Sequence, residues 1–184
     1  MLDIDIPLLT VLDEQTLVAF TGRVNVLDKI THQMLGVVVL REGHIFRCQY
    51  RGVQGLKAFF NIVIEGAQLL PQEFIVEPEI IHESVRQIHY PYSVLKAKTA
   101  DVLKRYQAVA HLRPPSQVKL LPRAAFLDSD EEVTDSEFQV LCTLTEWSLV
   151  DDLYRHCSLL DYEITESLVS LRRKEALQVV SART

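Results

Sequence analysis

The sequence predicts an α+β protein: a small antiparallel sheet with a packed helix, followed by a basic helix and a second, mainly helical domain. β-branched and aromatic runs around a glycine turn occupy the first third of the chain, as is typical of strands. Helical spacing of apolar residues dominates after residue 93. Prolines and an acidic run separate the two parts. We therefore expect domains over residues 1–85 and 133–184, joined by residues 86–132.

The first strand is expected over residues 16–27, TLVAFTGRVNVL, which lacks a helical apolar stripe. The runs GVVVL and HIFRCQY then flank Glu42 and Gly43, and a residue pair ending in glycine favours a tight hairpin turn. Phe46, Cys48 and Tyr50 alternate along the second strand and are assigned to the core face, which places Ile45 on the other face. Folding explains this histidine- and cysteine-containing stretch, so we predict a hairpin and no reactive site.

A helix and a short strand complete the expected sheet domain. Leu56, Phe59, Phe60 and Val63 recur at helical spacing before Gly66, which is expected to end the helix. The run FIVEP, residues 74–78, is then read as a strand that its proline stops or marks as an edge.

The middle of the chain is predicted to contain a basic helix from Ser93 to about residue 111. Its apolar stripe consists of Leu95, Val102, Tyr106 and Val109. Residues 86–133 carry 8 basic and 5 acidic groups, in a chain whose net charge is −6. The proline-containing, acidic stretch that follows the helix is expected to be an extended linker.

The last part predicts three short helices and a strand. Thr134 or Asp135 is expected to cap the first helix, whose inward residues would be Phe138, Leu141 and Leu144. Ser148 with Asp151 resembles a capping box for the second helix. Ile164, Leu168 and Leu171 share one face of the third helix, and the strand ALQVV follows. This order is winged-helix-like, with a strand pair that is truncated or built from another segment.

The first part of the chain resembles the PATAN domain, a domain of unknown function. The similar runs are FTGRVNVL, GVVVLREGHIFRCQYRGVQGLKAFFNIV and FIVEP, which together span about residues 17–80. The matching positions are Gly22, Gly36, Gly43, Gly55, Ala58 and Phe74, with Cys48 where alanine is common. The family usually has a longer helical segment after its first glycine. The resemblance implies a bacterial, non-catalytic interaction module of signalling, motility or polarity proteins.

A protein-protein interaction adaptor is therefore the leading expectation. Its partner would be another protein, with an acidic protein as a candidate. A homodimer is a further candidate. The candidate partner-binding residues are Lys98, Lys104, Arg105, Trp147, Arg172 and Arg173. The plainer explanation of Lys98, Lys104 and Arg105 is that they lie on the solvated face of a packed helix. Trp147, in a turn between helices, fits either a core position or an exposed anchor.

A winged-helix transcriptional regulator is the alternative. The third helix would then enter the major groove of DNA with its early residues. Those residues include Asp161, Glu163 and Glu166, whose carboxylates oppose binding to phosphates. DNA is therefore the less favoured partner.

No enzyme, cofactor or metal signature stands in the sequence. It lacks a GxSxG stretch, a Walker-type loop and a GxGxxG fingerprint, and its six histidines are scattered. We expect no catalytic, cofactor-binding or metal-binding residues. The distant cysteines Cys48, Cys142 and Cys157 are expected to be buried free thiols. The acidic, proline-broken N-terminus does not resemble a secretory signal. No window of the sequence approaches the roughly 20 apolar residues of a membrane helix, so we expect no membrane insertion. We expect a cytoplasmic protein.

Overall fold

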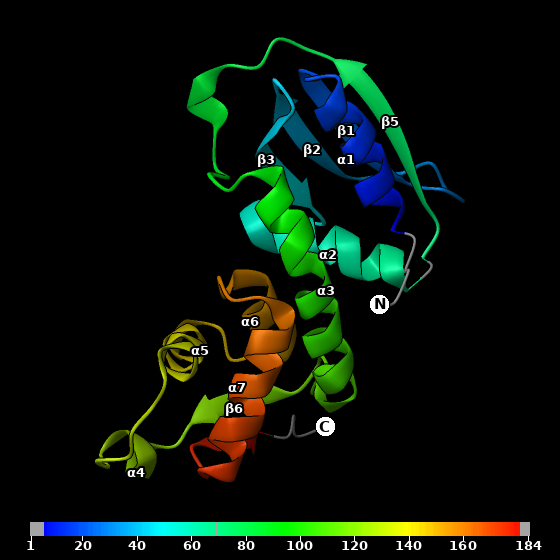
Figure 1. Ribbon diagram of the computed structural model, residues 1–184. Helices are drawn as coiled ribbons and strands as arrows, with labels where there is room; N and C mark the ends of the chain where they lie inside the picture. Colours follow the sequence, from blue (N-terminus) through cyan, green and yellow to red (C-terminus); the bar gives the residue numbers. More distant parts are fainter. Residues whose placement is uncertain (1–5, 69, 181–184) are drawn as a thin grey trace. The chain divides into compact units, whose positions relative to one another are not determined.

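The computed structural model describes residues 6–68 and 70–180 and divides into two compact units, Met1–Lys104 and Arg105–Thr184. The division lies inside helix α3 (Tyr92–Val109), which Figure 1 shows in green. The sequence predicts domains over residues 1–85 and 133–184, with residues 86–132 between them.

A five-stranded antiparallel sheet forms the centre of the first unit. Its strands are β1 (Gly22–Asp28), β2 (Met34–Arg41), β3 (His44–Tyr50), β4 (Val53–Gln54) and β5 (Gln72–Pro78). Their order is β4-β3-β2-β1-β5, and Figure 1 shows β5 at the outer edge. This sheet, with its packed helix and the mainly helical second unit, confirms the predicted α+β class.

The β2–β3 hairpin is built as the sequence predicts. Arg41 pairs with His44, and both turn residues have positive φ, 52° at Glu42 and 76° at Gly43, as a type I′ turn requires. The register then shifts near Val39, which places both Ile45 and Phe46 in the core. That bulge explains why Ile45, assigned to the outer face by strict alternation, is buried.

Two helices cover the inner face of the sheet. Helix α2 (Gly55–Ala67) buries the predicted Phe59, Phe60 and Val63 and runs one residue past Gly66. Helix α1 (Pro7–Leu17) was not expected; it begins with proline at its first turn and buries Leu8 and Leu12. The first strand therefore starts at Gly22 and not at residue 16, because the β-branched and aromatic stretch before it ends a helix.

The segment after β5 also belongs to the first unit. It contains the short 3₁₀-helix η1 (Glu83–Val85), and the N–H groups of Gln87 and Ile88 both donate to the carbonyl oxygen of Phe46. The Tyr92 hydroxyl then donates to Asp13 on α1 at 2.9 Å. These contacts attach residues 87–92 to the sheet domain.

The second unit is mainly helical. It contains η2 (Ala110–Leu112), β6 (Lys119–Pro122), α4 (Ala124–Leu127), α5 (Asp135–Glu146), α6 (Val150–His156), α7 (Asp161–Arg173) and β7 (Leu177–Val180). Its core includes Val140, Leu144, Leu153 and the predicted Ile164 and Leu171. Helix α7 and strand β7 follow the predicted third helix and strand.

Strand β6 lies in the segment that we expected to be an extended linker. It pairs antiparallel with β7, from Lys119 opposite Val180 to Pro122 opposite Leu177. On its other side Lys119 forms an isolated bridge with Leu149. The strand pair is thus built from another segment, one of the two arrangements that the sequence left open.

Two details of the helices correct the expectations. Phe138 is 59% exposed, because Glu137 takes the inward position instead. Ser148 does not cap α6, whose N-cap is Leu149; the Ser148 carbonyl accepts from the N–H of Leu120. The cap of α5 is confirmed: Thr134 and Glu137 form a reciprocal capping box.

Among residues 6–68 and 70–180, no helix combines the length and the apolarity that crossing a membrane requires.

Candidate functional site

A groove of about 750 Å³ lies beside strand β7 in the second unit. We call it the β7 groove. It is lined by the end of η2, the prolines after it, strands β6 and β7, and the C-terminal half of α7. Its apolar lining residues are Leu112, Val118, Leu120, Leu168, Leu177 and Val179.

The apolar lining of the β7 groove continues the core to the surface. Leu120 and Leu168 are only 6% and 4% exposed and belong to the core cluster, on which Val118 and Leu177 pack. Val179 and Leu112 are exposed large hydrophobic residues at the rim. Exposed apolar surface that is contiguous with a core and bordered by charges is typical of a binding site.

Three arginines border the β7 groove, and they differ in how they are neutralised. Arg113 pairs with Asp161 at 3.3 Å and stacks over the Tyr154 ring at 3.9 Å. Arg123 lies 3.8 Å from Glu175, in an exposed and therefore weak pair. Arg172 has no ion-pair partner among the described residues. With Glu175 as the one acidic lining residue, the groove favours an anionic ligand.

The structure places only one of the six predicted binding residues in this groove, Arg172. Its neighbour Arg173 is exposed but does not line it. Arg113 and Arg123 were missed because they lie in the presumed linker. The apolar residues of VKLLP between them were the signal for a strand, but the flanking prolines favoured a linker reading.

Arg105 of the second unit is engaged within the protein. Its guanidinium donates to Glu166 at 2.7 Å and lies over the Tyr162 ring at 4.4 Å. The hydrogen bond to Glu166 is the main reason why the pKa of Arg105 is raised. Within the second unit, this cation is therefore engaged with α7 and is less available to a ligand than Arg172.

The remaining candidates lie elsewhere. Lys98 and Lys104, both exposed, belong to the first unit, where the Lys98 ammonium lies 5.1 Å from the centre of the Tyr90 ring. Trp147 is 39% exposed and stacks on the imidazole of His156 at 4.0 Å. Trp147 is thus a partly exposed residue at the end of α5, outside the β7 groove.

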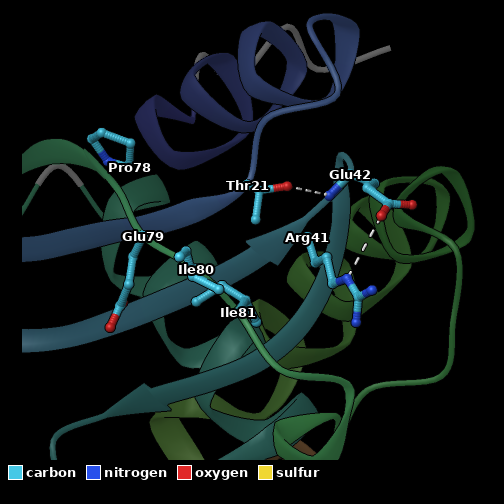
Figure 2. A pocket seen from close by; sticks show the side chains of 7 residues that line it. All are labelled: Thr21, Arg41, Glu42, Pro78, Glu79, Ile80 and Ile81. Carbon is cyan, nitrogen blue, oxygen red and sulfur yellow. Dashed lines mark hydrogen bonds and ion pairs between the residues drawn. The ribbon is translucent and has the colours of Figure 1, made fainter.

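A shallower cavity of about 560 Å³ lies at one end of the first unit's sheet, shown in Figure 2. Its lining residues are the residue before β1, the end of β2 with the turn that follows, and residues 78–81. Arg41 is held by Glu42 at 3.6 Å and by Glu83 at 3.0 Å. Glu42 donates its N–H to the Thr21 hydroxyl, and Glu79 pairs with Arg23. The charged groups of this cavity are thus already paired.

The thiols divide by burial. Cys48 and Cys157 are buried as expected, whereas Cys142 is exposed on α5; none of these three described cysteines forms a disulfide. Burial raises the pKa of the Cys48 thiol, which makes it unreactive. Within the described parts of the chain, no three histidine, cysteine or carboxylate side chains gather as metal ligands.

Comparisons with family models, with curated proteins and with solved structures found no match to this chain.

Proposed function

We propose that this chain is a non-enzymatic adaptor that binds a partner protein through the β7 groove. The observation that carries the proposal is the combination of an apolar floor with Arg172 at its border, a cation that has no ion-pair partner among the described residues. Apolar area supplies binding free energy, while a charge at the rim selects the partner and speeds association.

The partner segment proposed for the β7 groove carries carboxylates beside apolar side chains. Arginine recognises carboxylates well, because its planar guanidinium donates two parallel hydrogen bonds. Among the described residues Arg172 has no ion pair to break first, and Arg123 has only its exposed partner Glu175 to leave. A basic segment would instead leave these cations unmatched.

The resemblance of residues 17–80 to the PATAN domain supports a setting for this role: regulation of signalling, motility or polarity in a bacterial cytoplasm. In that proposal the sheet unit and the second unit each contribute an interaction surface. The PATAN-like unit supplies no catalytic residues.

Duplex DNA binding is the second candidate, favoured by the order of α5, α6, α7 and β7 in a winged-helix-like unit. The first turn of α7 carries Asp161 and Glu163. Their negative charge opposes a DNA backbone. We therefore expect no salt-dependent binding of a mixed-sequence duplex, measured by fluorescence anisotropy.

Panning of a random-peptide display library on the full chain tests the adaptor proposal. We expect enrichment of peptides with adjacent acidic and apolar residues. R172E should abolish that enrichment, and R173E should keep it, because Arg173 neighbours the groove without lining it. Absence of enrichment, or equal loss in both variants, would refute the proposal.

A further inference from the structure

We propose that the partner segment binds as an added β-strand along the free edge of β7; this inference rests on the proposed function of the β7 groove. Peptides frequently bind by extending a sheet, with backbone hydrogen bonds providing affinity and side-chain pockets providing specificity.

The hydrogen bonds of β6 show which backbone groups of β7 are free. The N–H of Leu120 donates to Ser148, away from β7, whereas the N–H of Arg123 donates to Ala176, at the start of the β7 segment. Because backbone groups alternate sides along a strand, Gln178 and Val180 face β6. The N–H and C=O groups of Leu177 and Val179 therefore point outward.

The described sheet order places no strand beyond β7. The outward groups of Leu177 and Val179 thus offer two donors and two acceptors to an incoming strand. The segment Leu177–Val180 contains neither a charged residue nor a proline that would prevent this edge from pairing with another strand. Natural proteins usually protect a free edge with one of these residues.

The same two residues present their side chains to the groove. Val179 pairs with Leu120, so Leu177 and Val179 share the face of that core residue. An added strand lies about 4.8 Å from β7 and alternates its side chains between two faces. The side chains on one face of the added strand would then contact the lining of the β7 groove near Arg172. The preferred occupant is therefore an extended segment in which apolar and acidic residues are interspersed.

Amide hydrogen exchange on the ¹⁵N-labelled full chain tests the geometry. The probe is the acetylated and amidated hexapeptide Glu-Val-Glu-Val-Glu-Val, with Lys-Val-Lys-Val-Lys-Val as its control. On saturation with the acidic peptide, the amides of Leu177 and Val179 should exchange about tenfold more slowly. The amides of Gln178 and Val180, which already face β6, should change little.

Each outcome of the exchange experiment decides one point. If R172E weakens binding of the acidic peptide but the alternating protection is absent, strand addition is refuted and the adaptor proposal stands. If neither hexapeptide binds at about millimolar concentration, both are refuted. If Leu177 and Val179 are protected without peptide, increasingly so at higher protein concentration, the occupant is a second copy of this chain and not a partner segment.

Discussion

The strands β5 and β7 both lie at the edge of a sheet, and they expose that edge differently. β5 ends in Pro78 and carries Glu73 and Glu77. β7 carries only Leu, Gln and two Val residues. Charges and prolines discourage pairing with another chain. An edge is therefore not by itself a binding site: charges and a proline protect β5 from pairing with another strand, whereas β7 is open to such pairing.

The described cavities of the two units differ in how their charged side chains are neutralised. In the first unit, Arg41 is neutralised by Glu42 and Glu83 beside the cavity near Pro78. In the second unit, Arg172 has no such partner among the residues described. The open edge and the available charge therefore occur together, which is what a docking surface for an acidic strand requires.

The largest expected effect concerns Glu137, which stabilises the second unit, the unit that contains β7. Glu137 is buried in α5, caps that helix and pairs with Lys174 at the end of α7 at 2.9 Å. Burial alone would raise its pKa, but hydrogen bonds from Ser170, Thr134 and Lys174 outweigh burial and lower the pKa to about 2. The unfolded value is 4.5, so the carboxylate stabilises the second unit by about 3 kcal/mol at neutral pH.

This stabilisation is fully present above about pH 4.5 and is lost as the pH falls towards about 2. We expect E137Q to lower the free energy of unfolding at pH 7 and to flatten its dependence on acid. The single tryptophan, Trp147, lies in the second unit, so urea titration followed by its fluorescence reports on that unit. E146Q, at an exposed position of α5, is the control and should behave as the wild type.

The second effect removes the charge that distinguishes the two cavities. R172E replaces an attractive rim charge by a repulsive one, and we expect the Kd for the acidic hexapeptide to rise about 10- to 30-fold. Isothermal titration calorimetry measures this change. R173E should alter the Kd by less than about threefold. An equal loss in both variants would mean that net charge, and not the groove, governs binding.

The third effect gives β7 one of the protections that β5 has. V179P removes an outward N–H without removing a hydrogen bond to β6. We expect about tenfold weaker peptide binding, with the fluorescence of Trp147 unchanged. V179A keeps the N–H and should cost about threefold. If V179A weakens binding as much as V179P, the side chain and not the edge carries the interaction.

The smallest effect removes protection from β5. The double variant E73V/E77V makes the outer face of this edge strand apolar, and we expect weak self-association with a Kd of about 1 mM. Sedimentation velocity at increasing concentration measures it. E131V/E132V removes two carboxylates from the exposed acidic run and should stay as the wild type. Equal association of both would trace the effect to lost charge alone.

Sequence patterns predicted correctly those elements whose structure depends mainly on neighbouring residues in the chain. Glu42 and Gly43 specify a hairpin turn whichever residues surround them, and the apolar stripe of α7 needs only its own spacing. Helix α1 was missed because its C-terminal end runs into residues that favour strands, while its burial depends on contacts with α2 and β5.

The site was harder to predict, because it is assembled from distant segments. β6 and β7 are separated by more than 50 residues, and each is too short for its sequence to predict that the two strands pair. Arg113 and Arg123 therefore stood in an apparent linker. Phe138 was misplaced for a different reason: the hydrogen bonds and ion pair of Glu137 make a buried carboxylate acceptable at the inward position.

The most direct test of the account maps where the acidic hexapeptide binds. A ¹⁵N–¹H correlation spectrum of the full chain, recorded during titration, reports on both edges at once. We predict shifts concentrated at Leu168, Arg172 and Leu177–Val180, with none along β5. Shifts at Glu73–Glu77, or at the first turn of α7 with the β7 groove unaffected, would contradict the account.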